Sequence, residues 1–191
     1  MEADPDRVAR WRERLGAYAG LTVGLTWQGN LNNPGGAARA VPLARLKPLF
    51  EVPGVRFVSL QKGSGSEQAR SLPASVPLID FTAEMDEGSG AFVDTAAVIR
   101  NLDLVIAIDT AVAHLAGAMG VPTWLALAIM PHWTWLLGRS DSPWYPTMRL
   151  FRQRKPGDWQ GVFEDMQSAL GERVRDLSQP RRITRKRGKR K

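Results

Sequence analysis

The stretch "LVIAIDTAVAHLAGAMG", residues 104–120, decides the fold of this chain. Its first part is a continuous apolar run that ends in an acid, which is typical of a central strand in a parallel sheet. Small apolar residues follow, and the stretch closes on Gly120 with Pro122 just beyond it, as a helix does. The stretch therefore predicts a buried strand over 103–109 that leads directly into a helix over 110–120.

Strands alternate with helices through the rest of the chain as well. We expect strands at 21–27, 55–60, 76–80, 122–128 and 147–153, and helices at 5–16, 41–52, 92–102 and 159–174. Such alternation favours an α/β fold, a Rossmann-like open parallel sheet with helices on both faces. The expected organisation is a linker helix at 1–19, the sheet domain at 20–175 and a basic tail at 176–191.

The composition is that of a folded, soluble chain. Of the 191 residues, 43% are hydrophobic and 24% are charged, which are ordinary values for one globular domain with tails. The chain has no cysteine, which excludes disulfides, thiolate metal sites and a cysteine nucleophile. We see neither a signal peptide nor a transmembrane segment, so the sequence predicts a cytoplasmic protein.

The net charge of +7 comes from one end of the chain. The segment "RRITRKRGKRK", residues 181–191, holds eight of the 26 lysines and arginines, so the remaining residues are close to neutral. A run of this kind is most often a solvated extension. The alternative is that it binds a polyanion or an anionic membrane surface.

Polar residues follow three of the predicted strands at the point where each strand ends. The carboxyl ends of parallel strands meet at one edge of a sheet, where ligands of open α/β folds bind. After the first strand, Gly29 lets backbone approach an anion and Asn30 offers an amide to a hydroxyl. After the second, Gln61 could pair with the edge of a base and Lys62 could neutralise a phosphate.

The third of these strand ends leads into the helix over 110–120. A helix that begins at Thr110 presents free N–H groups and the positive end of its dipole, which together bind phosphate. Ala111 leaves room for a ligand, Asp109 could bind a sugar hydroxyl, and His114 lies one turn past Thr110 on the same face. The alternative interpretation is that Asp109 and Thr110 only cap the helix and that His114 is a core residue.

Other site classes lack their sequence patterns. No dinucleotide-binding or phosphate-binding glycine motif occurs in the required context. The two histidines, His114 and His132, have no metal-ligand spacing and no arrangement with a serine nucleophile. We therefore expect no metal and no cofactor.

The segment "MPHWTWLLGRSDSPWYP", residues 130–146, is dense in aromatic side chains. Trp133, Trp135, Trp144 and Tyr145 could stack on a sugar or a base. They could equally anchor an irregular loop, which is the commoner use of such residues. A short helical turn is expected within 133–137.

Several segments, taken in order, resemble a known family: "VGLTWQGN", "RAVPLARLKPL", "GVRFVSLQKG", "DTAAVIRNLDLVIAIDTAVAHLAGAMGVPTW" and "WLLGRSDSPWYPTMRLFRQ". They are similar to the C-terminal domain of glycosyltransferase family nine, the ADP-heptose:lipopolysaccharide heptosyltransferase superfamily, and its tetratricopeptide-linked relatives. The resemblance covers roughly residues 6–172. It implies the GT-B architecture, of which this chain would be the C-terminal half that binds a nucleotide-diphospho-sugar donor.

The resemblance also implies a set of donor-binding residues and a mechanism. The set is Trp27, Gly29, Asn30, Arg39, Gln61, Lys62, Asp109, Thr110, Ala111 and His114. The implied reaction is a metal-independent, inverting glycosyl transfer in which Arg39 neutralises the departing diphosphate. The general base would come from an N-terminal acceptor domain that this sequence lacks, so we expect no catalytic residue in the chain. An acceptor domain or a tetratricopeptide chain would be the partner, and a non-catalytic nucleotide-sugar-binding module is the alternative function.

Overall fold

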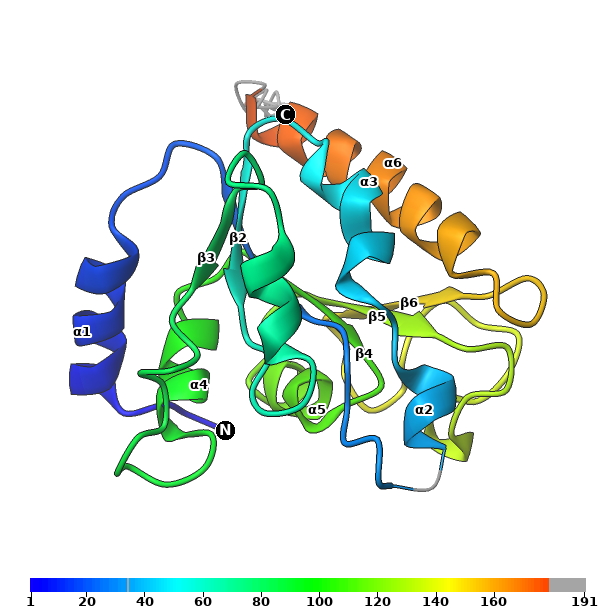
Figure 1. The fold of residues 1–191 in the computed structure, drawn as a ribbon, viewed down its shortest axis with the longest axis horizontal. Coiled ribbons are helices and arrows are strands. Elements are labelled where there is room, and N and C mark those ends of the chain that lie inside the picture. The colour runs from blue at the N-terminus through cyan, green and yellow to red at the C-terminus, as the bar shows by residue number, and fades with distance from the viewer. Residues whose placement is uncertain (34, 179–191) are drawn as a thin grey trace, which may run out of the picture.

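A six-stranded parallel sheet forms the centre of the molecule (Figure 1). The computed structural model describes residues 1–33 and 35–178. The strands are β1 (Leu21–Thr26), β2 (Val55–Ser59), β3 (Leu78–Asp80), β4 (Leu104–Ile108), β5 (Thr123–Leu127) and β6 (Met148–Arg152). Their order is β3-β2-β1-β4-β5-β6, and every neighbouring pair is parallel. The predicted Rossmann-like sheet is thus confirmed.

The strand order changes direction between β1 and β4, which pair with Val23 opposite Leu104. From β1 the chain proceeds outward through β2 and β3, and it then returns to β4 and proceeds the other way. In open α/β sheets a crevice forms at such a switch point, beyond the carboxyl ends of the strands. The topology therefore places the loops after β1 and β4 side by side.

Helices cover both faces of the sheet, as Figure 1 shows. One face carries η1 (Leu43–Leu46), α3 (Lys47–Phe50) and α6 (Trp159–Ser178), and the other carries α1 (Pro5–Leu15), α4 (Val93–Ile99) and α5 (Ala111–Ala118). Strand β4 explains why both faces need cover. Leu104, Ile106 and Ile108 enter the core on the α3 and α6 side, whereas Val105 and Ala107 enter the core on the other side.

Some elements differ in extent from the prediction. The helix expected over 41–52 is divided into a 3-10 helix and a short α-helix that begins at Lys47, because Pro48 has no N–H to donate. The last helix continues to Ser178 instead of ending at 174. The short helices α2 (Gly36–Arg39) and η2 (Ser66–Ser71) were not predicted. The 3-10 helix η3 (Trp133–Trp135) lies within 133–137, where a helical turn was predicted.

Helix α1 is joined to α4 through the carboxylate of Asp94, which is 2% exposed. Burial alone would raise the pKa of Asp94, but the hydrogen bonds that it accepts hold that pKa well below its usual range. One oxygen accepts from the side chains of Arg7, Arg10 and Trp11 at 2.8–2.9 Å, and the other accepts from Ser89 Oγ and the Asp86 N–H at 3.0 Å. The residues expected to form a linker helix are therefore packed onto the sheet domain.

Of the basic tail expected at 176–191, residues 176–178 belong to α6. Residues 179–191 lie outside the described residues, so the prediction about their binding stays a prediction. Within 1–33 and 35–178, no helix has the length and apolar character needed to cross a membrane.

Candidate functional site

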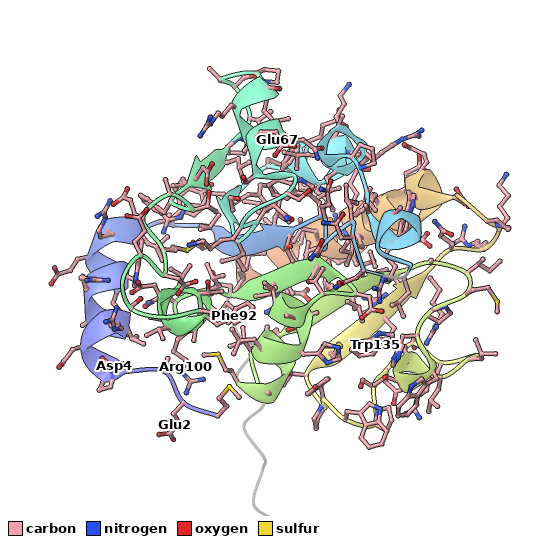
Figure 2. The ribbon with its side chains drawn as sticks, turned by 60° about the horizontal axis from the view of Figure 1, so that its bottom comes forward. Glu2, Asp4, Glu67, Phe92, Arg100 and Trp135 are labelled. Atoms are coloured by element: carbon pink, nitrogen blue, oxygen red, sulfur yellow. The ribbon has the colours of Figure 1, made fainter. Side chains whose placement is uncertain are left out.

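A cavity of about 1040 Å³ lies at the carboxyl ends of β1, β2 and β4, where the topology predicts a crevice. Loops after these strands form its walls together with the start of α5. Figure 2 brings this edge forward and shows Phe92 and Trp135 to the two sides of α5. Nine of the ten predicted donor-binding residues line the cavity: Gly29, Asn30, Arg39, Gln61, Lys62, Asp109, Thr110, Ala111 and His114.

The charged centre of the cavity is an ion pair between Arg39 and Asp109. Arg39 Nη1 lies 3.2 Å from Asp109 Oδ2, and the side chains are 30% and 8% exposed. Arg39 ends α2, which the tight approach of Gly36 to the Asn30 carbonyl brings into place, since a Cβ there would lie 2.3 Å from that oxygen. His114 Nε2 lies 3.9 Å from the other Asp109 oxygen. Asp109 is therefore held between a permanent cation and an imidazole.

The start of α5 forms one wall of the cavity. Thr110, in extended conformation, is the N-cap residue, which corrects the idea that Asp109 caps this helix. Its side chain makes no capping hydrogen bond, and its buried Oγ1 has no partner among the described residues. The first N–H groups of an α-helix have no intrahelical acceptor. This end of α5 thus offers donors and a positive dipole to a ligand.

Gln61 has a different role from the predicted contact with a base. It is 2% exposed, and both ends of its amide are fully engaged. Its Oε1 accepts from Thr26 Oγ1 and from the N–H groups of Trp27 and Gln28 at 2.9–3.0 Å. Its Nε2 donates to the carbonyls of Gln28 and Ser64 at 2.8 and 2.9 Å. Gln61 therefore fastens the loop after β1 to the loop after β2 and has no free group for a ligand.

Trp27 is the one predicted residue that does not line the cavity. Its side chain is fully buried in the core on the α3 and α6 side, because a large indole at a strand end gains more from burial than from a polar site. Its Nε1 donates to the Gly65 carbonyl at 3.2 Å, and its N–H belongs to the Gln61 network. Trp27 thus supports the loops that form the cavity.

The remaining loop residues keep groups available at the surface of the cavity. Gly29 lies against Thr110, whose Cγ2 is 3.5 Å from where a Cβ would be. Asn30 lines the cavity, and its Oδ1 accepts from the Asn32 N–H at 2.9 Å, which shapes the loop. Lys62 is exposed and donates to the Met85 carbonyl. Lys62 is therefore a second cation that lines the same cavity as Arg39.

Two residues that sequence reasoning missed, Asp86 and Phe92, also line the cavity. Both have positive φ, of 61° and 67°. The Asp86 carboxylate accepts from the N–H groups of Asp94 and Thr95 and from Thr95 Oγ1 at 2.6–3.1 Å, so it caps α4. The run "GSG" at 88–90, which follows Asp86, is the sequence signal that could have indicated a tight loop here.

The aromatic segment supports His114 rather than the cavity itself. Trp135 is buried, and its ring stacks on the His114 ring with centroids 5.0 Å apart. The Tyr145 hydroxyl lies 3.0 Å from His114 Nδ1. Arg152, whose pKa burial lowers, donates to the carbonyls of Trp135 and Arg139 and so holds this loop. The interpretation of the segment as an anchored loop therefore fits Trp135, whereas Trp133 and Trp144 are 72% and 54% exposed.

Among the described residues, no group of three or more histidine, aspartate or glutamate side chains is arranged to hold a metal ion.

Comparison with curated proteins identifies one similar sequence. FlbA of Caulobacter vibrioides is 33% identical over 180 residues, which make up 89% of this chain and 28% of FlbA. No family model matches the chain.

Two solved structures share the arrangement of elements. ADP-heptose LPS heptosyltransferase II of E. coli has a TM-score of 0.58 and 14% identity, over 91% of this chain and 54% of that protein. A glycosyl transferase family 9 protein of Veillonella parvula has a TM-score of 0.58 and 11% identity, over 93% of this chain and 53% of that protein. The chain has the fold of a glycosyltransferase family 9 domain. It spans about half the length of these solved chains and little more than a quarter of FlbA.

Proposed function

We propose that this chain is the donor-binding domain of a glycosyltransferase and that its cavity takes a nucleotide-diphospho-sugar. The fold of glycosyltransferase family 9 supports the class of reaction, and the residues of the cavity support the class of ligand. The observation that carries the proposal is the meeting of Arg39, Lys62 and the start of α5 in one cavity at the switch point of the sheet.

The balance of charge favours a dianionic ligand. Both carboxylates that line the cavity already have partners, since Asp86 caps α4 and Asp109 pairs with Arg39. The cations Arg39 and Lys62 line the same cavity as the start of α5, whose free N–H groups and dipole also favour an anion. A diphosphate seated against Thr110 would draw Arg39 away from Asp109. Asp109 would then be free to accept a hydrogen bond from a sugar hydroxyl.

The same groups would assist the transfer itself. When the bond between the sugar and the diphosphate breaks, negative charge develops on the departing phosphate. Arg39, Lys62 and the end of α5 would stabilise that charge, and such fixed donors are a large source of rate enhancement. Metal-independent, inverting transfer is part of this proposal. Asp86 is engaged in capping α4, and Asp109 would accept a hydrogen bond from the sugar of the donor, so we propose that the base that activates the acceptor comes from an acceptor domain or partner chain.

Calorimetry tests the proposed ligand. Titration with ADP, UDP, GDP and their glucose conjugates should show binding of at least one. Thr110→Val combined with Lys62→Ala should weaken that binding at least tenfold, because a phosphate loses a charged donor and the Thr110 hydroxyl. Lys155→Ala, an exposed lysine away from the cavity, is the control and should leave binding unchanged. Absence of binding to all six compounds would reject the donor-domain proposal.

Turnover separates an enzyme from a module that only binds nucleotide-sugars. Release of nucleoside diphosphate above background, abolished by the same double substitution, would support catalysis by the domain. Binding without turnover, also after addition of an acceptor domain, would favour the binding module.

A further inference from the structure

Three contacts fix the ring of His114 although its side chain is 42% exposed. Trp135 stacks under the ring, with an interplanar angle of 27°. Tyr145 meets it edge-on and brings its hydroxyl to 3.0 Å from Nδ1. Asp109 Oδ1 lies 3.9 Å from Nε2 on the opposite side of the ring. His114 thus lines the cavity and contacts Asp109, and two aromatic neighbours hold its ring in place.

Gly117 creates the space in which Tyr145 lies. A Cβ at Gly117 would lie 2.6 Å from Tyr145 Cγ and 2.9 Å from Tyr145 Cδ1, closer than real Cβ contacts. Gly117 follows His114 by three positions on α5, so the two residues share one face of the helix. Because glycine lowers helix stability, its presence inside α5 agrees with a need for this close approach.

We propose that Tyr145 is a positioning residue that, together with Asp109, fixes the tautomer of His114. The Asp109 carboxylate can only accept hydrogen bonds, and its second oxygen is already paired with Arg39. The nitrogen that faces Asp109, Nε2, therefore carries the proton, and Nδ1 accepts from the Tyr145 hydroxyl. This arrangement turns an N–H donor towards the cavity. Its use on a diphosphate or sugar oxygen rests on the proposed function, whereas the tautomer does not.

Nitrogen NMR of the imidazoles tests the tautomer directly, since the chain has only two histidines. In the native chain at neutral pH, His114 should show a protonated Nε2 and an Nδ1 that accepts a hydrogen bond. Tyr145→Phe keeps the ring and removes the hydroxyl, so the Nδ1 signal should move to that of a nitrogen without a hydrogen bond. His132, whose Nδ1 contacts Thr134, provides an internal reference that should not change. An identical His114 spectrum in the variant, or a proton on Nδ1 in the native chain, would overturn the proposal.

Gly117→Ala provides a second, independent variant. The added methyl group displaces the Tyr145 ring, so the His114 spectrum should change as it does in Tyr145→Phe. Gly171→Ala is the matched control, because Gly171 is also helical and the nearest atom outside its own helix backbone would be in the flexible Arg175 side chain, at 3.7 Å. A native His114 spectrum in a folded Gly117→Ala chain would contradict the role of this space.

Titration with ADP, UDP and GDP tests the use of the donor. Tyr145→Phe should weaken the binding of the nucleotide that the native chain prefers by about threefold to tenfold, the range for one hydrogen bond. Tyr18→Phe, at the other tyrosine, keeps its ring beside Arg56 and should bind like the native chain. Unchanged affinity in Tyr145→Phe overturns the positioning role. A native chain that binds none of the three contradicts the proposed function, while the imidazole spectra still decide whether Tyr145 fixes the tautomer.

Discussion

Asp94 and Asp109 both pair with arginine side chains, in surroundings that differ sharply. Asp94 lies beneath α1, and its two oxygens accept from five donors, of which three belong to α1 and two to the loop at 86–89. Asp109 lies at the start of α5 with one arginine at 3.2 Å and an imidazole nitrogen at 3.9 Å. The first carboxylate has every bonding position occupied, whereas the second keeps positions that a ligand can use.

The number of occupied hydrogen-bonding positions on a carboxylate distinguishes a structural ion pair from a binding site. A carboxylate that is saturated with short hydrogen bonds fixes elements to one another, and removal of it leaves several donors unpaired. A carboxylate with one longer contact, beside a helix end and an unpartnered hydroxyl, can exchange that contact for a ligand. We expect Asp94 to govern the stability of the fold and Asp109 with Arg39 to govern binding.

Removal of the saturated carboxylate should have the largest effect on stability. Asp94→Ala should lower the free energy of unfolding by about 3–5 kcal/mol, because the Trp11 N–H loses its partner in the core and two guanidinium groups lose their counter-ion. Urea denaturation followed by tryptophan fluorescence measures this loss. Asp165→Ala, at a more exposed pair with Arg154, is the control and should cost less than about 1 kcal/mol. Equal losses of stability in the two variants would contradict the structural role of Asp94.

Removal of the Gln61 amide, which joins the loops after β1 and β2, should have the next largest effect on stability. Gln61→Ala deletes five hydrogen bonds and leaves buried backbone groups of Trp27 and Gln28 without their partner, so we expect a loss of about 2–3 kcal/mol. The loops after β1 and β2 should also exchange their amide hydrogens faster, which hydrogen exchange can measure. Gln160→Ala, which removes an exposed side-chain contact with Glu164 in α6, should change neither quantity. Native exchange rates in Gln61→Ala would contradict the fastening role.

The dependence of stability on pH should come next. The folded state holds the pKa of Asp94 well below its usual range, so this group stabilises the fold fully above its unfolded pKa of about 3.9 and progressively less as the pH falls towards the folded pKa. The stability difference between the native chain and Asp94→Asn should therefore narrow by about 1 kcal/mol from pH 7 to pH 3. Urea titrations of both proteins across this range measure it. A difference that stays constant or widens would show that the pKa is not lowered.

The order and type of the long elements could be predicted from sequence because each carries a periodic apolar pattern. The strand at 104–108 is apolar on both faces, and that pattern by itself indicates a parallel sheet covered by helices. The split at Pro48 and the short helix at 36–39 depend on single residues and loop contacts, and short segments have no period to detect. The sequence therefore predicted the sheet but not the division at Pro48 or the short helix at 36–39.

The candidate site could be predicted as a place, and only partly as a set of contacts. The ends of three strands must meet at one edge, so Gly29, Lys62 and Thr110 were expected together and do line one cavity. Sequence cannot tell whether a polar side chain faces a ligand or its own backbone, and Gln61 was for this reason assigned to a base. Asp86 was missed because it caps α4 from eight residues away.

The assignment of Asp94 to stability and of Asp109 with Arg39 to binding is tested most directly by replacing one arginine partner of each aspartate. Arg39→Gln and Arg7→Gln should each be measured for free energy of unfolding and for affinity towards ADP, UDP and GDP. We predict that Arg39→Gln weakens nucleotide binding about tenfold or more while it changes stability by less than about 1 kcal/mol. Arg7→Gln should lower stability by about 1 kcal/mol and leave the affinity unchanged. Nucleotide affinity that is native in Arg39→Gln, or equally reduced in both variants, would contradict the account.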